Sequence, residues 1–108
     1  MNKSIISNTE KRLKDILSNR IMMMDGAMGT MIQQHHLTEE DYRGKQFSTF
    51  ASPDGERELF LKGNNELLSI TQPTIIQQIH ESYLDAGSDI IETNTFGGTH
   101  VVLGDYDL

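Results

Sequence analysis

The stretch "RIMMMDGAMGT", from Arg20 to Thr30, decides the expected fold. Four apolar residues, Ile21 to Met24, run directly into Asp25 and a turn that contains two glycines. A short, continuous apolar run is typical of a strand that is buried on both faces, as strands of parallel sheets are. We therefore expect a buried strand over 21–24, with its methionines filling the core because thioethers pack adaptably.

A predicted helix and a second strand follow farther along the chain. Apolar residues recur at helical spacing from Pro73 to Ala86, Pro73 suits a first helical position, and Gly87 suits a left-handed cap. A second buried strand is expected from Ile90 to Thr95. The order strand, helix, strand indicates a βαβ unit with parallel strands, and therefore the α/β class.

The segments outside this unit are also informative. A helix is expected from Ser7 to Asn19, and another from Ala27 to Gln34. A long loop over 37–58 contains Thr38 and Asp41 at the spacing of a helix cap pair. We divide the chain into residues 1–19, an N-terminal helix, and residues 20–108, which hold both strands and their connecting helices.

Composition excludes several classes of partner. The net charge is −7, with 9 Lys and Arg against 16 Asp and Glu, so neither nucleic acid nor an anionic membrane is an expected partner. The 108 residues include no cysteine, which rules out thiolate metal ligands from this chain. No apolar run suits a signal peptide or a membrane helix, and we expect a cytoplasmic protein.

Asp25 is the first candidate site residue, because an acid at the end of an apolar strand needs a cation or hydrogen-bond donors. If a helix begins nearby, the backbone amides of Gly26 to Met28 face outward and attract an anion. This pairing suits a zwitterion, whose ammonium group would lie on Asp25 and whose carboxylate would lie on the amides. The alternative is that Asp25 caps the following helix, since aspartate is a favoured cap.

Polar residues on the second strand extend this candidate site. Asn94 and Thr95 are expected at the same mouth as Asp25, with Glu92 on the face of Asn94; the alternative is that they bond only to neighbouring loops. Metal binding is not favoured for the four histidines, because their spacing does not match a metal site. They are His35, His36, His80 and His100.

Four motifs in a fixed order resemble a known family. They are "MDGAMGT" at Met24–Thr30, "DYRG" at Asp41–Gly44, "LKGNNELLSITQP" at Leu61–Pro73 and "AGSDIIETNTF" at Ala86–Phe96. Together they are similar to the N-terminal homocysteine-binding region of cobalamin-dependent methionine synthases, over roughly residues 10–108.

The resemblance implies a fold, a reaction and a binding site. The homocysteine domain of that family is a TIM (β/α)₈ barrel, and this chain would supply its first βαβ portion. The whole enzyme would transfer a methyl group from methyltetrahydrofolate, through cobalamin, to zinc-bound homocysteine, making methionine. The resemblance places Asp25 on the homocysteine amino group, and Gly26 and Met28 near its carboxylate; we add Asn94 to this substrate-binding set.

The departures from the family pattern limit what this chain is expected to do alone. The family holds zinc with three cysteines that this sequence lacks, and a whole barrel takes about 250 residues. We therefore expect a truncated barrel that holds neither zinc nor cobalamin, is inactive alone, and is either poorly folded or self-associating because its strand edges are unpaired. Two alternatives are a non-catalytic α/β interaction module and a phosphate-binding α/β enzyme. Such an enzyme would need a second acid at the position that Met23 occupies.

Overall fold

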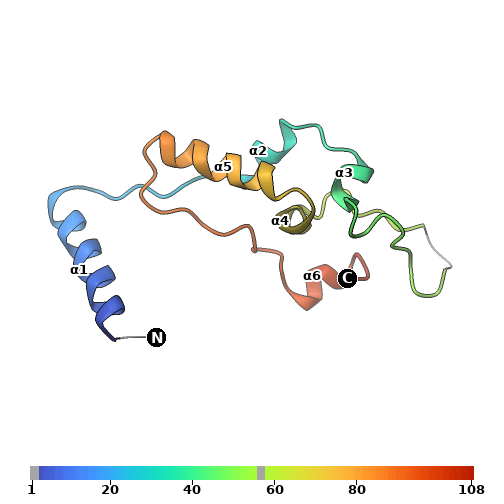
Figure 1. Cartoon of the computed structure of the whole chain (residues 1–108), viewed down its shortest axis with the longest axis horizontal. Helices are drawn as coiled ribbons and strands as arrows, with labels where there is room; N and C mark the ends of the chain where they lie inside the picture. The colour runs from blue at the N-terminus through green and yellow to red at the C-terminus, as the bar shows by residue number, and fades with distance from the viewer. Residues whose placement is uncertain (1–2, 56–57) are drawn as a thin grey trace.

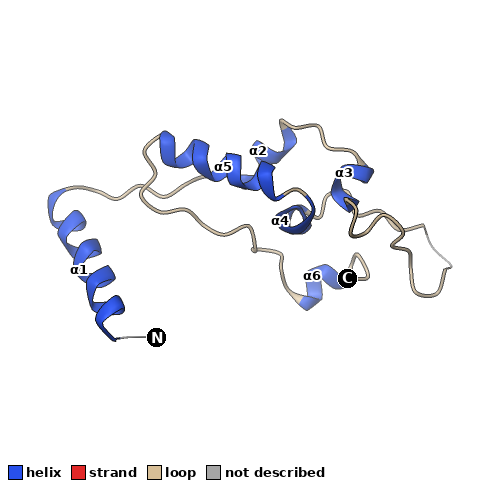
Figure 2. Cartoon of the chain, in the orientation of Figure 1, coloured by secondary structure: helices blue, strands red, loops and turns tan. Residues whose placement is uncertain are grey.

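A computed structural model describes residues 3–55 and 58–108 as an elongated molecule of 58 × 32 × 20 Å. The described residues form helices joined by loops (Figure 1, Figure 2). The helices are α1 (Lys3–Asn19), α2 (Met28–Gln33), α3 (Glu39–Arg43), the 3-10 helix η1 (Asn65–Leu67), α4 (Leu68–Thr71), α5 (Pro73–Asp85) and α6 (His100–Gly104).

The predicted βαβ portion of a TIM barrel is wrong for this structure. No strand and no sheet occur within residues 3–55 and 58–108, and the two segments expected to be strands are loops (Figure 2). Their single point of sheet-like pairing is an isolated parallel bridge between Met24 and Ile90. The observed architecture is helical, and two loops touch where two strands were expected.

The physical reason lies in what surrounds the two loops. The carboxylate of Asp89 accepts the backbone N–H of Met23 at 2.9 Å, so a side chain takes a donor that a ladder would use. The methionines expected to fill the core are largely outside it, because Met23 is 58% exposed and Met24 is also exposed. A lone pair of extended segments is marginal in water without further strands or a covering layer on both faces.

The helices that local sequence patterns predict are present in the structure. The helix expected from Ser7 lies within α1, and α5 begins at Pro73 as expected. Gly87 has a φ of +111°, which favours glycine, and its N–H donates to the carbonyl of Leu84 at 3.0 Å. The N–H of Ser88 donates to the carbonyl of Tyr83 at 3.0 Å, which completes a Schellman cap. The predicted end of α5 is therefore confirmed.

The core lies among the short central helices and one loop residue. The buried apolar residues are Ile32, Tyr42, Leu61, Leu67, Leu68, Ile76 and Ile79. Ile76 and Ile79 form the stripe predicted for α5, and this helix packs on both α2 and α4. The loops that follow Met24 and Ile90 contribute no residue to this core.

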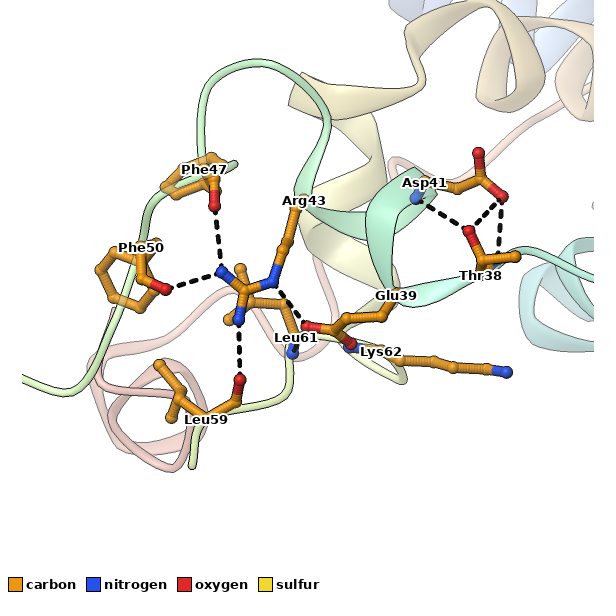
Figure 3. Close-up of polar contacts among 9 residues, drawn as sticks. All are labelled: Thr38, Glu39, Asp41, Arg43, Phe47, Phe50, Leu59, Leu61 and Lys62. Atoms are coloured by element: carbon orange, nitrogen blue, oxygen red, sulfur yellow. Dashed lines mark hydrogen bonds and ion pairs between the residues drawn. The ribbon is translucent and has the colours of Figure 1, made fainter. Parts of the chain in front are cut away.

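Arg43, at the end of α3, joins three parts of the long loop (Figure 3). Its guanidinium donates to the carbonyls of Phe47 and Phe50, at 3.2 and 2.6 Å, and of Leu59, at 2.7 Å. It also donates to the Glu39 carboxylate at 2.9 Å. One cation therefore joins three chain segments that lie outside the helices.

Glu39 completes this network from the start of α3. Its carboxylate accepts the backbone N–H groups of Leu61 and Lys62, both at 2.7 Å (Figure 3). Partial burial alone would raise the pKa of Glu39, but the two amides and Arg43 outweigh it and lower the pKa below 4.5. The predicted cap pair is also confirmed beside it, since Thr38 and Asp41 form a capping box.

We expect the free energy of unfolding to fall as the pH drops below about 4.5, because the folded state must then accept protons at acids whose pKa values are depressed. The stabilisation from Glu39 is complete above its ordinary pKa and is lost as the pH falls through the lower, folded value. Urea unfolding between pH 6 and 3 measures this slope. Glu39→Gln should flatten it, and a slope identical to that of the wild type would contradict the assignment.

Large apolar side chains remain on the surface. Phe96 is fully exposed, and Ile21 and Val101 are 82% and 83% exposed. Exposed apolar groups beside unpaired backbone favour association, so we propose that copies of this chain associate with one another. Light scattering after size exclusion should give a mass that rises with concentration above 12.2 kDa. A constant monomer mass up to millimolar concentration would contradict this proposal.

Candidate functional site

Asp25 lies where the two touching loops meet. Its backbone N–H donates to the carbonyl of Ile90 at 2.9 Å, and its side-chain Oδ2 accepts the N–H of Glu92 at 3.0 Å. The alternative role as a helix cap is wrong, because α2 has Ala27 at its N-cap and no side-chain hydrogen bond there. The half-buried carboxylate is thus held against the other loop and not against a helix end.

The turn after Asp25 is held against α5 by Tyr83. The Tyr83 hydroxyl donates to the carbonyl of Ala27 at 2.8 Å. A Cβ atom on Gly26 would lie 3.2 Å from that hydroxyl, so the close approach favours glycine. Within the described residues, no hydrogen bond occupies the backbone N–H of Gly26 or Met28. Both amides are therefore available to an acceptor from outside the chain.

Asn94 joins the second loop to the helical core. Its side-chain Nδ2 donates to the carbonyl of Asn65 at 2.8 Å and to the Ser69 hydroxyl at 3.1 Å. Asn65 in turn accepts the Tyr42 hydroxyl at 2.8 Å, and burial raises the pKa of that hydroxyl. The partners of Asn94 therefore lie on η1 and α4 and not in neighbouring loops, and they hold the residue in the same cavity lining as Asp25.

These residues line one cavity of about 260 Å³. The four residues predicted for substrate binding, Asp25, Gly26, Met28 and Asn94, all lie in its wall. The remaining lining residues are Gly29, Asn65, Glu66, Glu92, Thr93, Thr95 and Phe96. A chain reversal through η1, α4 and α5 brings together residues that lie up to about seventy positions apart.

The cavity has an acidic wall. Three carboxylates line it, from Asp25, Glu66 and Glu92, and its lining includes no lysine, arginine or histidine. Glu66 also accepts the backbone N–H of buried Gly97 at 2.9 Å, which fixes one of these carboxylates. Such a wall attracts a cationic group, and the open amides of Gly26 and Met28 offer donors to an anion beside it.

The four histidines do not take part in this cavity. His35, His36 and His100 are exposed, while His80 is half-buried on α5 with no hydrogen-bond partner for Nδ1 among the described residues. In residues 3–55 and 58–108, no three His, Cys, Asp or Glu side chains gather as metal ligands would.

The sequence of residues 22–108 matches the model of the homocysteine S-methyltransferase family. This match includes every residue that lines the cavity. The chain belongs to the homocysteine S-methyltransferase family. Membership supports a function related to methyl transfer.

Sequence reasoning missed part of this family member's cavity wall. Asn65 was expected only in a turn and Glu66 had no predicted role, yet both residues of η1 line the same cavity as Asp25. A local signal existed, because the Asn64 side chain accepts the N–H of Leu67 and caps η1. Their position in the wall carries no such signal, since it depends on how η1 packs.

One further finding concerns the membrane. Among the helices formed by residues 3–55 and 58–108, none has the length and apolar character needed to cross a bilayer.

Proposed function

We propose that this chain recognises the amino-acid end of homocysteine in a methionine-synthase type of methyl transfer. The observation that carries the proposal is the single cavity that Asp25, Gly26, Met28 and Asn94 line together. Homocysteine is a small zwitterion, and a cavity of about 260 Å³ accommodates a ligand of its size. The chain would hold and orient the substrate, and the thiol would stay free to react.

Asp25 is the proposed partner of the ammonium group. Its Oδ2 accepts a single backbone N–H, from Glu92, which leaves acceptor capacity on a carboxylate with about four lone-pair positions. Glu66 and Glu92 add negative charge in the same wall and favour a cation there. A charge-assisted hydrogen bond to an ammonium group is roughly twice as strong as a neutral one.

The proposed partners of the substrate carboxylate are the backbone amides of Gly26 and Met28. Neither amide has an acceptor within the described residues, and both line the cavity. Donors are needed at this end because three acids in the wall would otherwise repel the carboxylate. Asn94 would set the depth of the cavity, since its amide is already anchored to Asn65 and Ser69.

The zinc of methionine synthases does not fit the residues of this chain. Zinc bound to a thiol substrate prefers thiolate ligands, and the sequence has no cysteine. Within the described residues no three candidate ligands gather. The proposed role of this chain is therefore recognition of the amino acid.

We expect zinc titration of this chain by calorimetry to show weak binding or none, because its carboxylates and histidines do not form a set of ligands. Methylcobalamin should likewise fail to methylate homocysteine faster with the chain than without it. A stoichiometric zinc site of sub-micromolar affinity, lost when histidines are replaced, would contradict this expectation.

The proposed function is tested by comparing three ligands in an NMR titration of the whole chain. Homocysteine should shift the amide resonances of residues that line the cavity. Two analogues each lack one charged group: 4-mercaptobutanoate has no ammonium, and 3-mercaptopropylamine has no carboxylate. Each should bind at least about tenfold more weakly than homocysteine. Equal affinity for all three, or shifts outside the cavity only, would refute the proposal.

A further inference from the structure

Asp89 lies outside the cavity, and its carboxylate accepts three hydrogen bonds. Its Oδ1 and Oδ2 accept the two terminal nitrogens of Arg20, at 2.6 and 2.7 Å. Its Oδ2 also accepts the backbone N–H of Met23 at 2.9 Å. The Asp89 side chain is 15% exposed and that of Arg20 is 52% exposed, so the pair lies at the surface with its acid mostly covered.

The main chain of Asp89 bonds to the same residue as its side chain. The backbone N–H groups of Asp89 and Ile90 both donate to the carbonyl of Met23, at 2.7 and 3.3 Å. Both polar backbone groups of Met23 are therefore held by the 89–90 segment. Arg20 holds the carboxylate in place by a bidentate pair, which fixes orientation better than a single bond does.

This contact sets which residues face each other farther along the two loops. Two positions after Met23 lies Asp25, whose N–H donates to Ile90 at 2.9 Å and whose carboxylate accepts Glu92 at 3.0 Å. A slip of one residue would replace Asp25 with Met24 or Gly26 and would reverse which side chains face the cavity. No strand ladder holds these loops in register, because Met24 and Ile90 form an isolated bridge.

We propose that Asp89, held by Arg20, is a positioning residue that sets the register of the 20–25 segment and so places Asp25 in the cavity. The proposal rests on the proposed function only where it concerns homocysteine. The Arg20 hydrogen bonds, followed by that of the Met23 amide, keep the pKa of Asp89 well below its usual range. The carboxylate is consequently ionised, and its bonds to Arg20 and Met23 persist, throughout the neutral range.

Amide hydrogen exchange of the ligand-free chain tests the proposal directly. Asp89→Ala removes the acceptor for Met23, so exchange at the Glu92 amide should accelerate about tenfold, while the core amides of Leu67 and Ile79 keep their rates. Asp89→Asn retains an acceptor oxygen for Met23 and should restore most of the protection. Asp105→Ala, at the exposed C-cap that follows α6, is the matched control and should change none of these exchange rates.

Three results would contradict the positioning role of Asp89. Unchanged exchange at Glu92 in Asp89→Ala would show that the register does not depend on this carboxylate. Equal acceleration at Glu92, Leu67 and Ile79 would show a general loss of stability instead of a local one. In a chain that binds homocysteine, Asp89→Ala should also weaken binding about tenfold, and undiminished affinity would overturn the role as well. Because exchange is measured without ligand, failure of the wild type to bind homocysteine would refute the proposed function alone.

Discussion

Replacing Arg43 with methionine is expected to lower the free energy of unfolding by about 2–4 kcal/mol, the largest effect we predict for one residue. The change removes hydrogen bonds to three loop carbonyls and leaves the mostly covered Glu39 carboxylate without its cation. Methionine keeps most of the apolar stem, so the loss reports on the polar head group. Urea unfolding at pH 7 measures the difference.

The position of Arg43, and not its charge, should account for this loss. Arg12→Met on exposed α1 removes the same charge and should change stability by at most about 0.5 kcal/mol. Arg43→Lys should fall between the wild type and Arg43→Met, because an ammonium cannot reproduce the planar fork of a guanidinium. Equal stability of Arg43→Met and Arg12→Met would contradict the role that we assign to Arg43.

Asp25→Asn is expected to weaken homocysteine binding by about 1.5–3 kcal/mol, which is roughly 10- to 150-fold in affinity. Asparagine preserves an acceptor for the Glu92 amide, so the loop contact should survive while the charge facing the ammonium is lost. Titration of the whole chain, followed by NMR or calorimetry, measures this change.

The Asp25 result has its own internal controls. Asp15→Asn removes an equal charge from exposed α1 and should leave the affinity unchanged. The analogue without an ammonium group should bind Asp25→Asn at least as well as it binds the wild type, because it makes no ammonium contact with Asp25 and its carboxylate meets less negative charge. If Asp25→Asn kept full affinity for homocysteine and changed only the melting temperature, Asp25 would be structural.

The sequence was most informative where the signal is local. The cap of α3 at Thr38 and Asp41, and the end of α5 at Gly87, depend on bonds within about four residues. Helical spacing likewise placed Ile76 and Ile79 in the core. The order of the four motifs also agrees with the family match over residues 22–108. Such features can be read from the chain because few distant contacts are needed to form them.

The error over the strands arose where the sequence pattern is ambiguous. The run from Ile21 to Met24 predicted a buried strand, but a strand needs neighbours on both its edges and its faces. In the structure Asp89 takes the Met23 amide, and the apolar run remains largely exposed. No property of the run itself distinguishes these outcomes, because hydrogen-bond partners for its backbone come from residues more than sixty positions away.

The sequence by itself therefore determined the family, the main helices and the candidacy of Asp25 and Asn94 for one site. Only the tertiary structure decided that Asn65 and Glu66 line the same cavity as Asp25, that Arg43 joins separate loop segments, and that Asp89 accepts the Met23 amide. The physical reason is the range of the interactions. Caps and helical stripes act over a few residues, whereas a cavity wall or a buried cation acts between segments that meet only after the chain has folded.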